Sequence, residues 1–275
     1  MMAWHGCIFR KARFLPSNQL PKIANLYIYI FLPPLFFFLS FFLSVCTFCV
    51  TWRQDFRKAF KFFEMAAKGG EPAAQNAVAI CYENGEGVTE DPEKAAHWHQ
   101  QAAAKGSSSS QNCLGLCYMR GDGVALDWEK GMHWLQKAAA QGNAEAQTNY
   151  AGGLMRGEGV SRNEEKAFKW LQQAAAQDTY PQAWHDIGAC YKKGRGVQKS
   201  LERATFWYKK AAAAGVAPSQ ASLALMYEKG EGVPQDYRLA LKYMRQAALQ
   251  NYPGARQKLM QLAIIVNLLP QKPSG

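Results

Sequence analysis

The chain has 275 residues and a formal net charge of +11, a length that suits one or two compact domains or a single elongated one. The charge is uneven: residues 179–275 hold 14 basic and 5 acidic side chains, whereas residues 51–178 hold 14 basic and 16 acidic ones. Two interpretations of this basic excess stay open, a solvated surface and a site for an acidic partner or an anionic membrane. Nucleic acid is not an expected partner, because no base-stacking platform or recognised binding module accompanies the charge.

The first 52 residues divide into a basic leader, residues 1–25, and a hydrophobic segment, residues 26–52. The leader has four basic and no acidic side chains, which fits a signal anchor or a mitochondrial presequence. Residues 26–50 are an uncharged stretch of 25 residues, long enough to cross a bilayer. Pro33 and Pro34 interrupt it and leave about 18 residues for an unbroken helix. Basic residues flank both sides equally, so the positive-inside rule gives no orientation.

Beyond residue 53 the tetrapeptide Gly-x-Gly-Val returns at a nearly constant interval. Its copies begin at Gly85, Gly121, Gly157, Gly194 and Gly230, with spacings of 36, 36, 37 and 36 residues. An aromatic or long apolar residue comes three residues before each copy, at Tyr82, Tyr118, Leu154, Tyr191 and Tyr227. Such a period marks units that cannot bury their apolar faces alone and must stack on their neighbours. The spacing therefore predicts a solenoid.

Each repeat predicts two helices. In the first full copy, Ala74, Val78 and Tyr82 lie on one face of a helix over residues 73–83, which the Gly-x-Gly turn ends. An acidic start with a proline, residues 91–93, then opens a second helix. That helix should carry Trp98, and alanines on either side of it, toward the core.

A second regular position lies eight residues past an aromatic column of the second helices, Phe62, Trp98, Trp134, Trp170, Trp207 and Tyr243. It holds Gly70, Gly106, Gly142, Asp178, Gly215 and Asn251. All three residue types tolerate the left-handed backbone conformation, so this position predicts the end of the second helix. The extra residue in the one 37-residue spacing is expected in the connection at residues 177–181, where a longer loop costs little.

The amino-terminal side of the array is cut in mid-repeat. Residues 55–70 match the second half of a repeat, but the turn expected at residues 49–52 reads Cys-Val-Thr-Trp. Three interpretations of residues 1–52 stay open: a mis-joined or alternative amino terminus, a membrane anchor and a cleaved leader. An anchor would make the chain a single-pass membrane protein; otherwise a reducing compartment such as the cytoplasm is expected.

At the other end, residues 255–262 resemble one more first helix that caps the stack. Residues 263–269 are too apolar all round for a solvated cap. Residues 263–275 form an apolar extension and a tail: we expect residues 263–269 to fold back onto the last repeat, with the docking of a partner as the alternative, and residues 270–275 to be disordered.

These residues resemble the Sel-1-like repeat family, a relative of the tetratricopeptide repeat. The shared pattern is small-x3-Leu-Gly-x2-Tyr, Gly-x-Gly-Val, then acidic-x3-Ala-x2-Trp-x3-Ala-Ala, met most fully by residues 111–142 and 219–251. The resemblance covers residues 53–262. It implies an all-α, right-handed superhelical solenoid of about five 36-residue helix-turn-helix repeats, with an N-terminal half-repeat and a C-terminal capping helix. Trp184 departs from the pattern, and it indicates either packing under the inserted loop or a local binding hot spot.

The resemblance implies a non-catalytic scaffold or adaptor that binds protein or peptide partners. The alternative is a membrane-anchored quality-control or assembly factor of the endoplasmic reticulum or mitochondria. A small-molecule-binding hydrolase of the cysteine-rich repeat type is disfavoured, because no cysteine lies where it could pair the two helices of a repeat. Cys81, Cys117 and Cys190 instead share one column, and we expect them to be small buried hydrophobic residues.

Motifs for chemistry are absent from the sequence. There is no two-histidine zinc spacing, no Walker loop and no nucleophile elbow. His97 and His133 share one column, but lysine and phenylalanine take that column in later repeats, which indicates a solvent-facing position. We therefore expect no enzyme activity, no cofactor and no metal.

In the related tetratricopeptide fold the first helices line a concave groove, so the same register predicts a partner-binding groove here. Three columns of the first helices are expected to form it, with an apolar floor and polar walls. One of these columns contains Ile80, Leu116, Gly152, Ala189 and Leu225. The predicted groove residues of the walls are Asn76, Glu83, Asn112, Met119, Thr148, Met155, His185, Lys192 and Glu228. The alternative for each position is ordinary packing between helices.

Overall fold

The structure is a computed structural model that describes residues 56–268. The leader of residues 1–25, the hydrophobic segment of residues 26–52 and the tail after Leu268 lie outside the described residues. The described part contains twelve α-helices and no strand. They are α4 (Phe56–Lys68), α5 (Pro72–Asn84), α6 (Pro92–Ala104), α7 (Ser108–Arg120), α8 (Trp128–Ala140), α9 (Ala144–Arg156), α10 (Glu164–Ala176), α11 (Pro181–Lys193), α12 (Leu201–Ala213), α13 (Ala217–Lys229), α14 (Tyr237–Leu249) and α15 (Ala255–Leu268).

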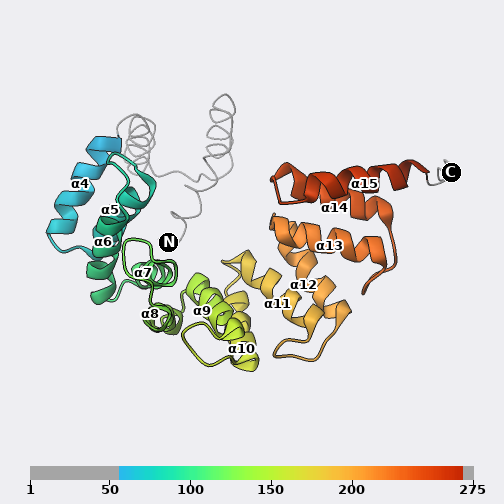
Figure 1. Cartoon of the computed structure of the whole chain (residues 1–275), viewed down its shortest axis with the longest axis horizontal. Coiled ribbons are helices and arrows are strands. Elements are labelled where there is room, and N and C mark those ends of the chain that lie inside the picture. Colours follow the sequence, from blue (N-terminus) through green and yellow to red (C-terminus); the bar gives the residue numbers. More distant parts are fainter. Residues whose placement is uncertain (1–55, 269–275) are drawn as a thin grey trace, which may run out of the picture. The chain divides into compact units, whose positions relative to one another are not determined.

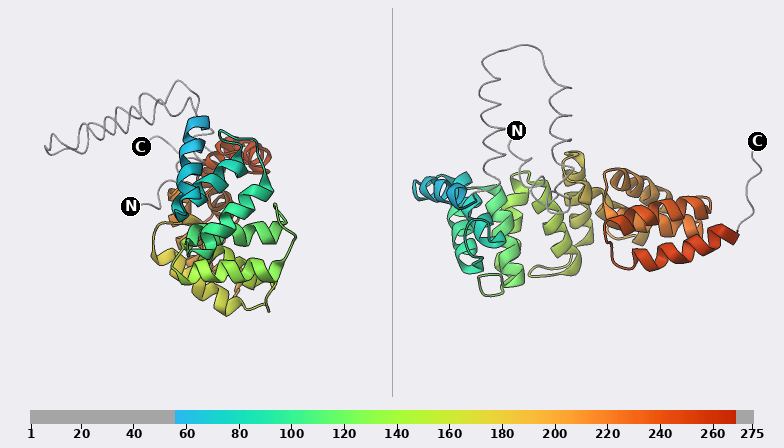
Figure 2. Two further views of the ribbon diagram at one scale, coloured as in Figure 1. Left: turned by 90° about the vertical axis from the view of Figure 1, so that its left-hand side faces the viewer. Right: turned by 90° about the horizontal axis from the view of Figure 1, so that it is seen from above.

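Each helix packs against the next one in the chain, so consecutive helices form hairpins and consecutive hairpins stack. We call α5, α7, α9, α11, α13 and α15 the first helices, and α4, α6, α8, α10, α12 and α14 the second helices. Figures 1 and 2 show the hairpins following one another in chain order, with α7, α9 and α11 on the inner side of the curve and α8 and α10 on its outer side. The predicted all-α repeat solenoid is confirmed.

The residues predicted to begin and end the helices lie at the helix ends that the structure shows. The turn glycine Gly121 ends α7 with φ +77°, and its N–H donates to the carbonyl oxygen of Cys117 at 2.8 Å. The second helix α8 begins at Asp127, whose Oδ1 accepts from the Lys130 N–H at 2.9 Å. All six residues of the second-helix end have positive φ, including Asp178 at +52° and Asn251 at +56°.

The second glycine of each turn does more than adopt positive φ. A Cβ on Gly123 would overlap the carbonyl oxygen of Pro92, the first residue of α6 in the preceding repeat. Gly87, Gly159, Gly196 and Gly232 meet the first residue of the preceding second helix in the same way. Only glycine allows this close approach of two backbones. The turn is therefore also a point of contact between successive repeats.

The inserted residue lies where it was expected. Four residues, 177–180, separate α10 from α11, whereas three residues, 105–107, separate α6 from α7. The core of each repeat is rich in alanine, as predicted: Ala95 and Ala102 are buried, and Trp98 is half-buried beside them.

The carboxyl-terminal prediction needs a correction. Residues 263–268 do not fold back onto the last repeat, because they continue α15 without a break. Leu262 is fully buried against the stack, while Ile264 and Leu268 are exposed. Ala263, Ile265 and Val266 are half-buried, so the extension is partly covered along one side of the continuing helix.

Candidate functional site

Each first helix keeps one face open to solvent. On α9, Ala146, Gln147, Tyr150 and Leu154 are among the buried residues, whereas Asn149 and Gly152 are accessible. Because α9 lies on the inner side of the curve in Figure 1, this accessible face belongs to the inner surface of the array. Corresponding positions of α5, α7, α11 and α13 are accessible too, which gives the inner surface five parallel strips.

The floor predicted for this surface is a column of half-buried residues: Ile80, Leu116, Gly152, Ala189 and Leu225. Large apolar side chains therefore stand toward both ends, and the two smallest residues lie in the middle. The Arg156 guanidinium occupies the space over Gly152, where an added Cβ would come within 3.3 Å of Nη1. The floor is thus apolar at its ends and polar at its centre.

The first predicted wall column lies mainly at the seam between repeats. Asn112 and Thr148 are 3% and 7% exposed, and Asn112 Oδ1 accepts from Asn149 Nδ2 at 3.0 Å. The other two polar members also contact the next first helix. Asn76 Oδ1 accepts from Ser110 Oγ at 2.8 Å, and His185 Nδ1 lies 2.8 Å from Ser219 Oγ. Asn76, Asn112 and His185 therefore join neighbouring repeats, whereas Thr148 Oγ1 donates to the Ala144 carbonyl oxygen of its own helix at 2.9 Å.

The second predicted wall column is more accessible, and three of its members are in ion pairs or hydrogen bonds. Glu83 Oε1 lies 3.1 Å from His99 Nε2, and Glu228 Oε1 lies 2.7 Å from Lys258 Nζ. Lys192 Nζ lies 3.4 Å from Glu231 Oε2 in the next turn. The remaining members, Met119 and Met155, are half-buried apolar side chains between these charges.

A further column, half-buried at all five positions, was missed by the sequence analysis. It lies one residue after the seam column and contains Ala77, Cys113, Asn149, Asp186 and Ser222. The polar members of this column, Asn149, Asp186 and Ser222, were the available signal. The prediction instead chose the residue one position earlier in each helix. The choice between the two columns depends on the rotation of each helix in the stack.

Asp186 in this column has a shifted pKa. Burial raises the pKa of its carboxyl to about 6, against the opposing effects of a hydrogen bond from Gln182 and the charge of Arg156. Burial also lowers the pKa of the neighbouring His185 to about 4. Both side chains are therefore held in an environment that disfavours their charged forms.

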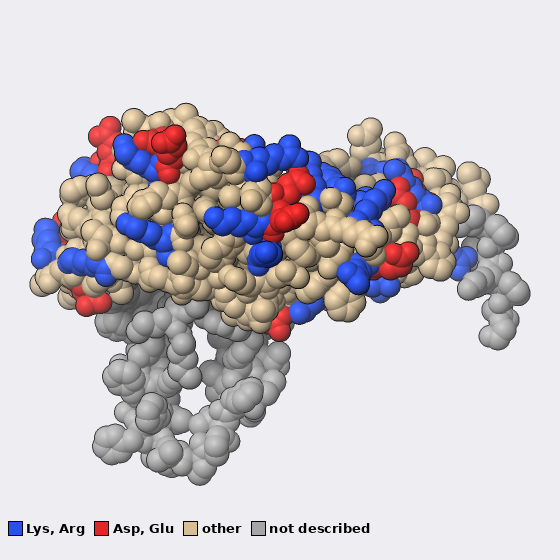
Figure 3. Space-filling view, turned by 90° about the horizontal axis from the view of Figure 1, so that it is seen from below, with Lys and Arg blue, Asp and Glu red and all other residues tan. Residues whose placement is uncertain are grey.

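The basic residues between Lys192 and Lys210, part of the basic excess of residues 179–275, do not form one uniform patch. Lys210 Nζ lies 2.6 Å from Asp178 Oδ1, and Arg195 Nε lies 4.0 Å from Glu164 Oε1. Arg203 and Lys209 instead lie over the rings of Tyr191 and Tyr227. Figure 3 shows one face of the described chain, with acidic side chains interspersed among the basic ones.

Trp184 packs under the inserted loop, the first of the two alternatives for this residue. It is 7% exposed, and its Nε1 donates to the Ala175 carbonyl oxygen at 3.3 Å. Lys210 Nζ lies 4.2 Å from the centre of the ring. A side chain in this position cannot serve as an exposed anchor for a ligand.

The cysteines and histidines follow the sequence-based interpretation. Cys81, Cys117 and Cys190 are buried, and burial raises the pKa of these thiols to about 11, 12 and 12. His97 is exposed and lies 2.8 Å from Gln101 Nε2. Within residues 56–268 no group of three or more histidine, cysteine or acidic side chains is arranged to hold a metal.

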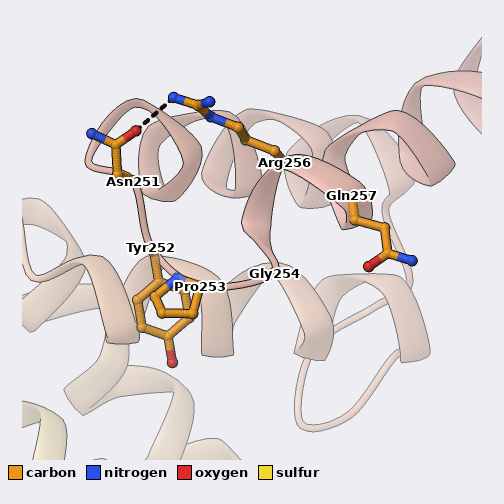
Figure 4. Close-up of a pocket in the computed structure, with 6 residues that line it drawn as sticks. All are labelled: Asn251, Tyr252, Pro253, Gly254, Arg256 and Gln257. Carbon is orange, nitrogen blue, oxygen red and sulfur yellow. Dashed lines mark hydrogen bonds between the residues drawn. The ribbon is translucent and has the colours of Figure 1, made fainter.

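An open hollow of about 400 Å³ lies at the turn between α14 and α15. Figure 4 shows that its lining residues do not converge: Arg256 reaches back to Asn251, and Gln257 points away from Tyr252. This hollow offers no concave arrangement of polar groups.

Among the described helices, none combines the length and apolar character needed to span a membrane.

A family model described as Sel1 repeat matches residues 53–71, 72–107, 108–143, 144–179, 181–216 and 217–252. The first match is half as long as the others, which agrees with the predicted half-repeat followed by five full repeats. No curated protein matches the chain.

Solved structures agree with this match. A Sel1 repeat protein from Oxalobacter formigenes is 28% identical with a TM-score of 0.71, over 84% of this chain and 92% of that one. A protective antigen of uropathogenic Escherichia coli that displays an SLR fold is 32% identical with a TM-score of 0.68. The match covers 80% of this chain but 47% of the antigen, so the chain spans about half the antigen's length. An immunity protein of Pseudomonas aeruginosa, 20% identical over 79% of this chain and 82% of that one with a TM-score of 0.50, shares the fold alone.

Proposed function

Because the chain belongs to the Sel1 repeat family, whose members are generally protein-interaction scaffolds, we propose that it is a non-catalytic adaptor that binds a partner protein along the inner surface. The occupant is a peptide segment or an amphipathic helix that lies across the first helices. The observation that carries this proposal is the continuous column of half-buried floor residues, which crosses five consecutive repeats.

The floor supports this choice of ligand. Leu116 and Leu225 present half-buried apolar surface, and accessible polar side chains such as Asn149 and Ser222 lie in the adjacent column. An apolar strip next to hydrogen-bonding groups suits a peptide that buries alternate anchors while its polar groups find partners. The half-buried Met119 and Met155 add flexible apolar surface that can adapt to more than one ligand.

The walls make the surface selective for shape more than for net charge. Lys192 pairs with Glu231, and Glu228 pairs with Lys258, so several wall charges are already neutralised. The charged groups at the centre of the floor are Arg156 and Asp186. We expect the partner segment to carry apolar anchors at both ends and a polar residue between them.

The test uses the full chain as bait for proximity labelling, followed by direct binding of each purified candidate. Leu116→Arg places a charge on the floor, where it should weaken binding at least tenfold. Phe206→Arg is the matched control, because Phe206 is 62% exposed on the second helix α12 and should leave binding unchanged. Equal binding by both variants would remove the inner surface from the proposal.

The membrane-anchored alternative uses the same inner surface and differs in residues 26–52, which lie outside the described residues. The apolar sequence of that segment is the observation behind it. Alkaline carbonate extraction of membranes from cells that express the full chain tests it. Complete release of the protein would exclude the anchor, and retention that is lost on deleting residues 26–52 would support it.

A further inference from the structure

The centre of the inner surface carries a half-buried carboxylate, that of Asp186. This residue lies in the middle of α11, which contacts α9 directly, and both helices lie on the inner side of the curve in Figure 1. Asp186 is the charged member of a column whose other residues are neutral: Ala77, Cys113, Asn149 and Ser222. A partner that crosses the five first helices along this column therefore meets one negative charge.

The carboxylate of Asp186 is poorly paired within the chain. Its hydrogen bond from Gln182 Nε2 is 3.4 Å long, beyond the range of about 2.7–3.2 Å that is usual for an N–H donor. Its polar neighbours in the column have partners, because Asn149 Nδ2 donates to Asn112 Oδ1 at 3.0 Å and Ser222 is hydrogen-bonded to Tyr208. Two carboxylate oxygens can accept several hydrogen bonds. Asp186 thus keeps capacity that the described residues leave unused.

The guanidinium of Arg156 does not fully compensate this carboxylate. Arg156 folds back over Gly152, and its positive charge acts on Asp186. Its Nε, however, lies 2.5 Å from Glu158 Oε1. The other oxygen of that side chain, Glu158 Oε2, is buried and has no hydrogen-bond partner among the described residues. Two carboxylates therefore share one guanidinium, which leaves an excess of negative charge at the centre of the surface.

The pKa of the Asp186 carboxyl agrees with this arrangement. Burial raises that pKa to about 6, and it outweighs the opposing effects of the Gln182 hydrogen bond and the Arg156 charge. At neutral pH the carboxylate is still mostly ionised, so the folded chain holds a charge whose lost hydration is not fully replaced. A second positive charge beside Asp186 would favour its ionised form.

The floor leaves an approach to Asp186 on one side. Ala189 follows Asp186 by three residues and so lies next to it on the same face of α11. In the floor column this alanine takes the position that Leu116 and Leu225 hold nearer the ends. The space over Gly152 on the other side is occupied by Arg156. A side chain from a bound partner can therefore reach the carboxylate over Ala189.

We propose that the partner segment bound along the inner surface carries a lysine or an arginine between its apolar anchors, and that this cation pairs with the Asp186 carboxylate. The inference rests on the proposed function and gives the chemistry of the central polar residue of the partner.

The other classes of central residue fit less well. A carboxylate in the partner would face Asp186 as a like charge, and to pair with Arg156 it would have to displace Glu158. An apolar residue would cover Asp186 without supplying a donor, which is costly for an ionised group. A cation supplies both the donor and the missing charge.

The basic residues of the same repeat do not oppose a cation at this place. Lys192 Nζ lies 3.4 Å from Glu231 Oε2, and Arg195 Nε lies 4.0 Å from Glu164 Oε1. Lys193 ends α11, seven residues after Asp186, which is about 10 Å along the helix. The net charge of +11 acts at longer range, where it favours acidic ligands. Selection of a basic residue would thus report the local site and not the net charge.

The experiment selects peptides from a random library displayed on phage, with the full-length chain as the immobilised target. The enriched peptides should share a lysine or arginine between apolar residues. Synthetic copies are then titrated against variants. Asp186→Asn removes the charge and keeps the shape of the side chain, so it should weaken binding about tenfold. Glu129→Gln is the matched control, because it removes one negative charge from an exposed position on the second helix α8 and should leave binding unchanged.

A double-mutant cycle identifies the pair. Replacing the basic residue of the peptide by glutamine should weaken binding to the unchanged chain by the same factor as Asp186→Asn, and should have no further effect on that variant. Thermal unfolding of Asp186→Asn is measured alongside, so that weaker binding by a variant of unreduced stability reports the lost contact.

The outcomes separate this inference from the proposed function. Enriched peptides that Leu116→Arg weakens, but that lack a basic residue or bind Asp186→Asn as well as the unchanged chain, would overturn the inference and leave the proposed function in place. Equal weakening by Asp186→Asn and Glu129→Gln would also overturn it. A selection that enriches no peptide, or peptides that ignore Leu116→Arg, would overturn both.

Discussion

The indole Nε1 of Trp184 donates to the carbonyl oxygen of Ala175 at 3.3 Å, a bond that a glutamine side chain makes in the other four full repeats. Gln111 reaches Ala103, and Gln147 reaches Ala139, both at 3.1 Å. A second glutamine usually completes the arrangement, as where Gln141 donates to Gln111 at 2.7 Å. Beside Trp184 that second position holds Ala214, and the Lys210 ammonium lies over the indole ring instead.

Two substitutions separate the roles of this indole. Trp184→Phe removes the N–H donor and leaves the Ala175 carbonyl without this partner, which should lower the free energy of unfolding by about 1 kcal/mol. Trp184→Ala also opens a cavity under the inserted loop and should cost about 3–5 kcal/mol. Denaturant unfolding measures both, and equal losses would mean that the ring itself contributes nothing.

Two glycines with positive φ, one at the end of a second helix and one in a Gly-x-Gly turn, give a second prediction. Gly142→Ala should cost about 1–2 kcal/mol, because φ is +84° there but no atom lies within 4 Å of an added Cβ. Gly123→Ala has a similar φ, +69°, and in addition forces its Cβ into the Pro92 backbone. It should cost about 3 kcal/mol or more.

Thermal and denaturant unfolding of the two glycine variants should therefore rank Gly123→Ala well below Gly142→Ala. If both lose the same stability, the close backbone approach between repeats contributes nothing measurable.

Asp186 predicts a pH dependence. The folded-state pKa of its carboxyl, about 6, lies above its ordinary value of 3.8, so the folded state holds the proton more tightly than the unfolded chain. Ionisation therefore costs stability that grows from about pH 4 to about pH 6 and stays constant above. Asp186→Asn removes this cost and should stabilise the protein by about 1–3 kcal/mol at pH 7, with little change at pH 4.

The quantity to measure is the difference in free energy of unfolding between this variant and the unchanged chain at each pH. His185, whose folded-state pKa is lowered to about 4, destabilises the protein as pH falls from about 6.5, and it does so in both chains. Its contribution cancels in the difference. A difference that does not vary between pH 4 and pH 7 would contradict the role of Asp186.

The buried thiols give a further prediction. Burial raises the pKa of Cys81 to about 11 and that of Cys117 and Cys190 to about 12, so the reactive thiolate is scarce at neutral pH. Alkylation followed by peptide mass analysis should label these three cysteines slowly in the folded protein. The same cysteines in denaturant are the control, and fast labelling without denaturant would show that the repeats open.

Much of the candidate site could be located from the sequence, but the exposure of its residues could not. The period placed the first helices and their floor column, from Ile80 to Leu225. It also selected Asn112 and Thr148 as wall residues, and these are buried at the seam between repeats. The neighbouring column with Asn149 and Asp186 is half-buried in all five repeats.

By itself the sequence determined the helices, their ends, the period and the place of the inserted residue. These features depend on local chemistry. Gly121 adopts a left-handed backbone conformation at the end of α7, and the Asp127 carboxylate caps the start of α8. Only the tertiary structure decided that Gly123 lies against the backbone of Pro92, that Asn112 contacts the next repeat, and that Ile264 and Leu268 of α15 are exposed. The reason is that each of these depends on which neighbouring helix covers a face and at what rotation. Packing between repeats sets that rotation, and no single repeat encodes it.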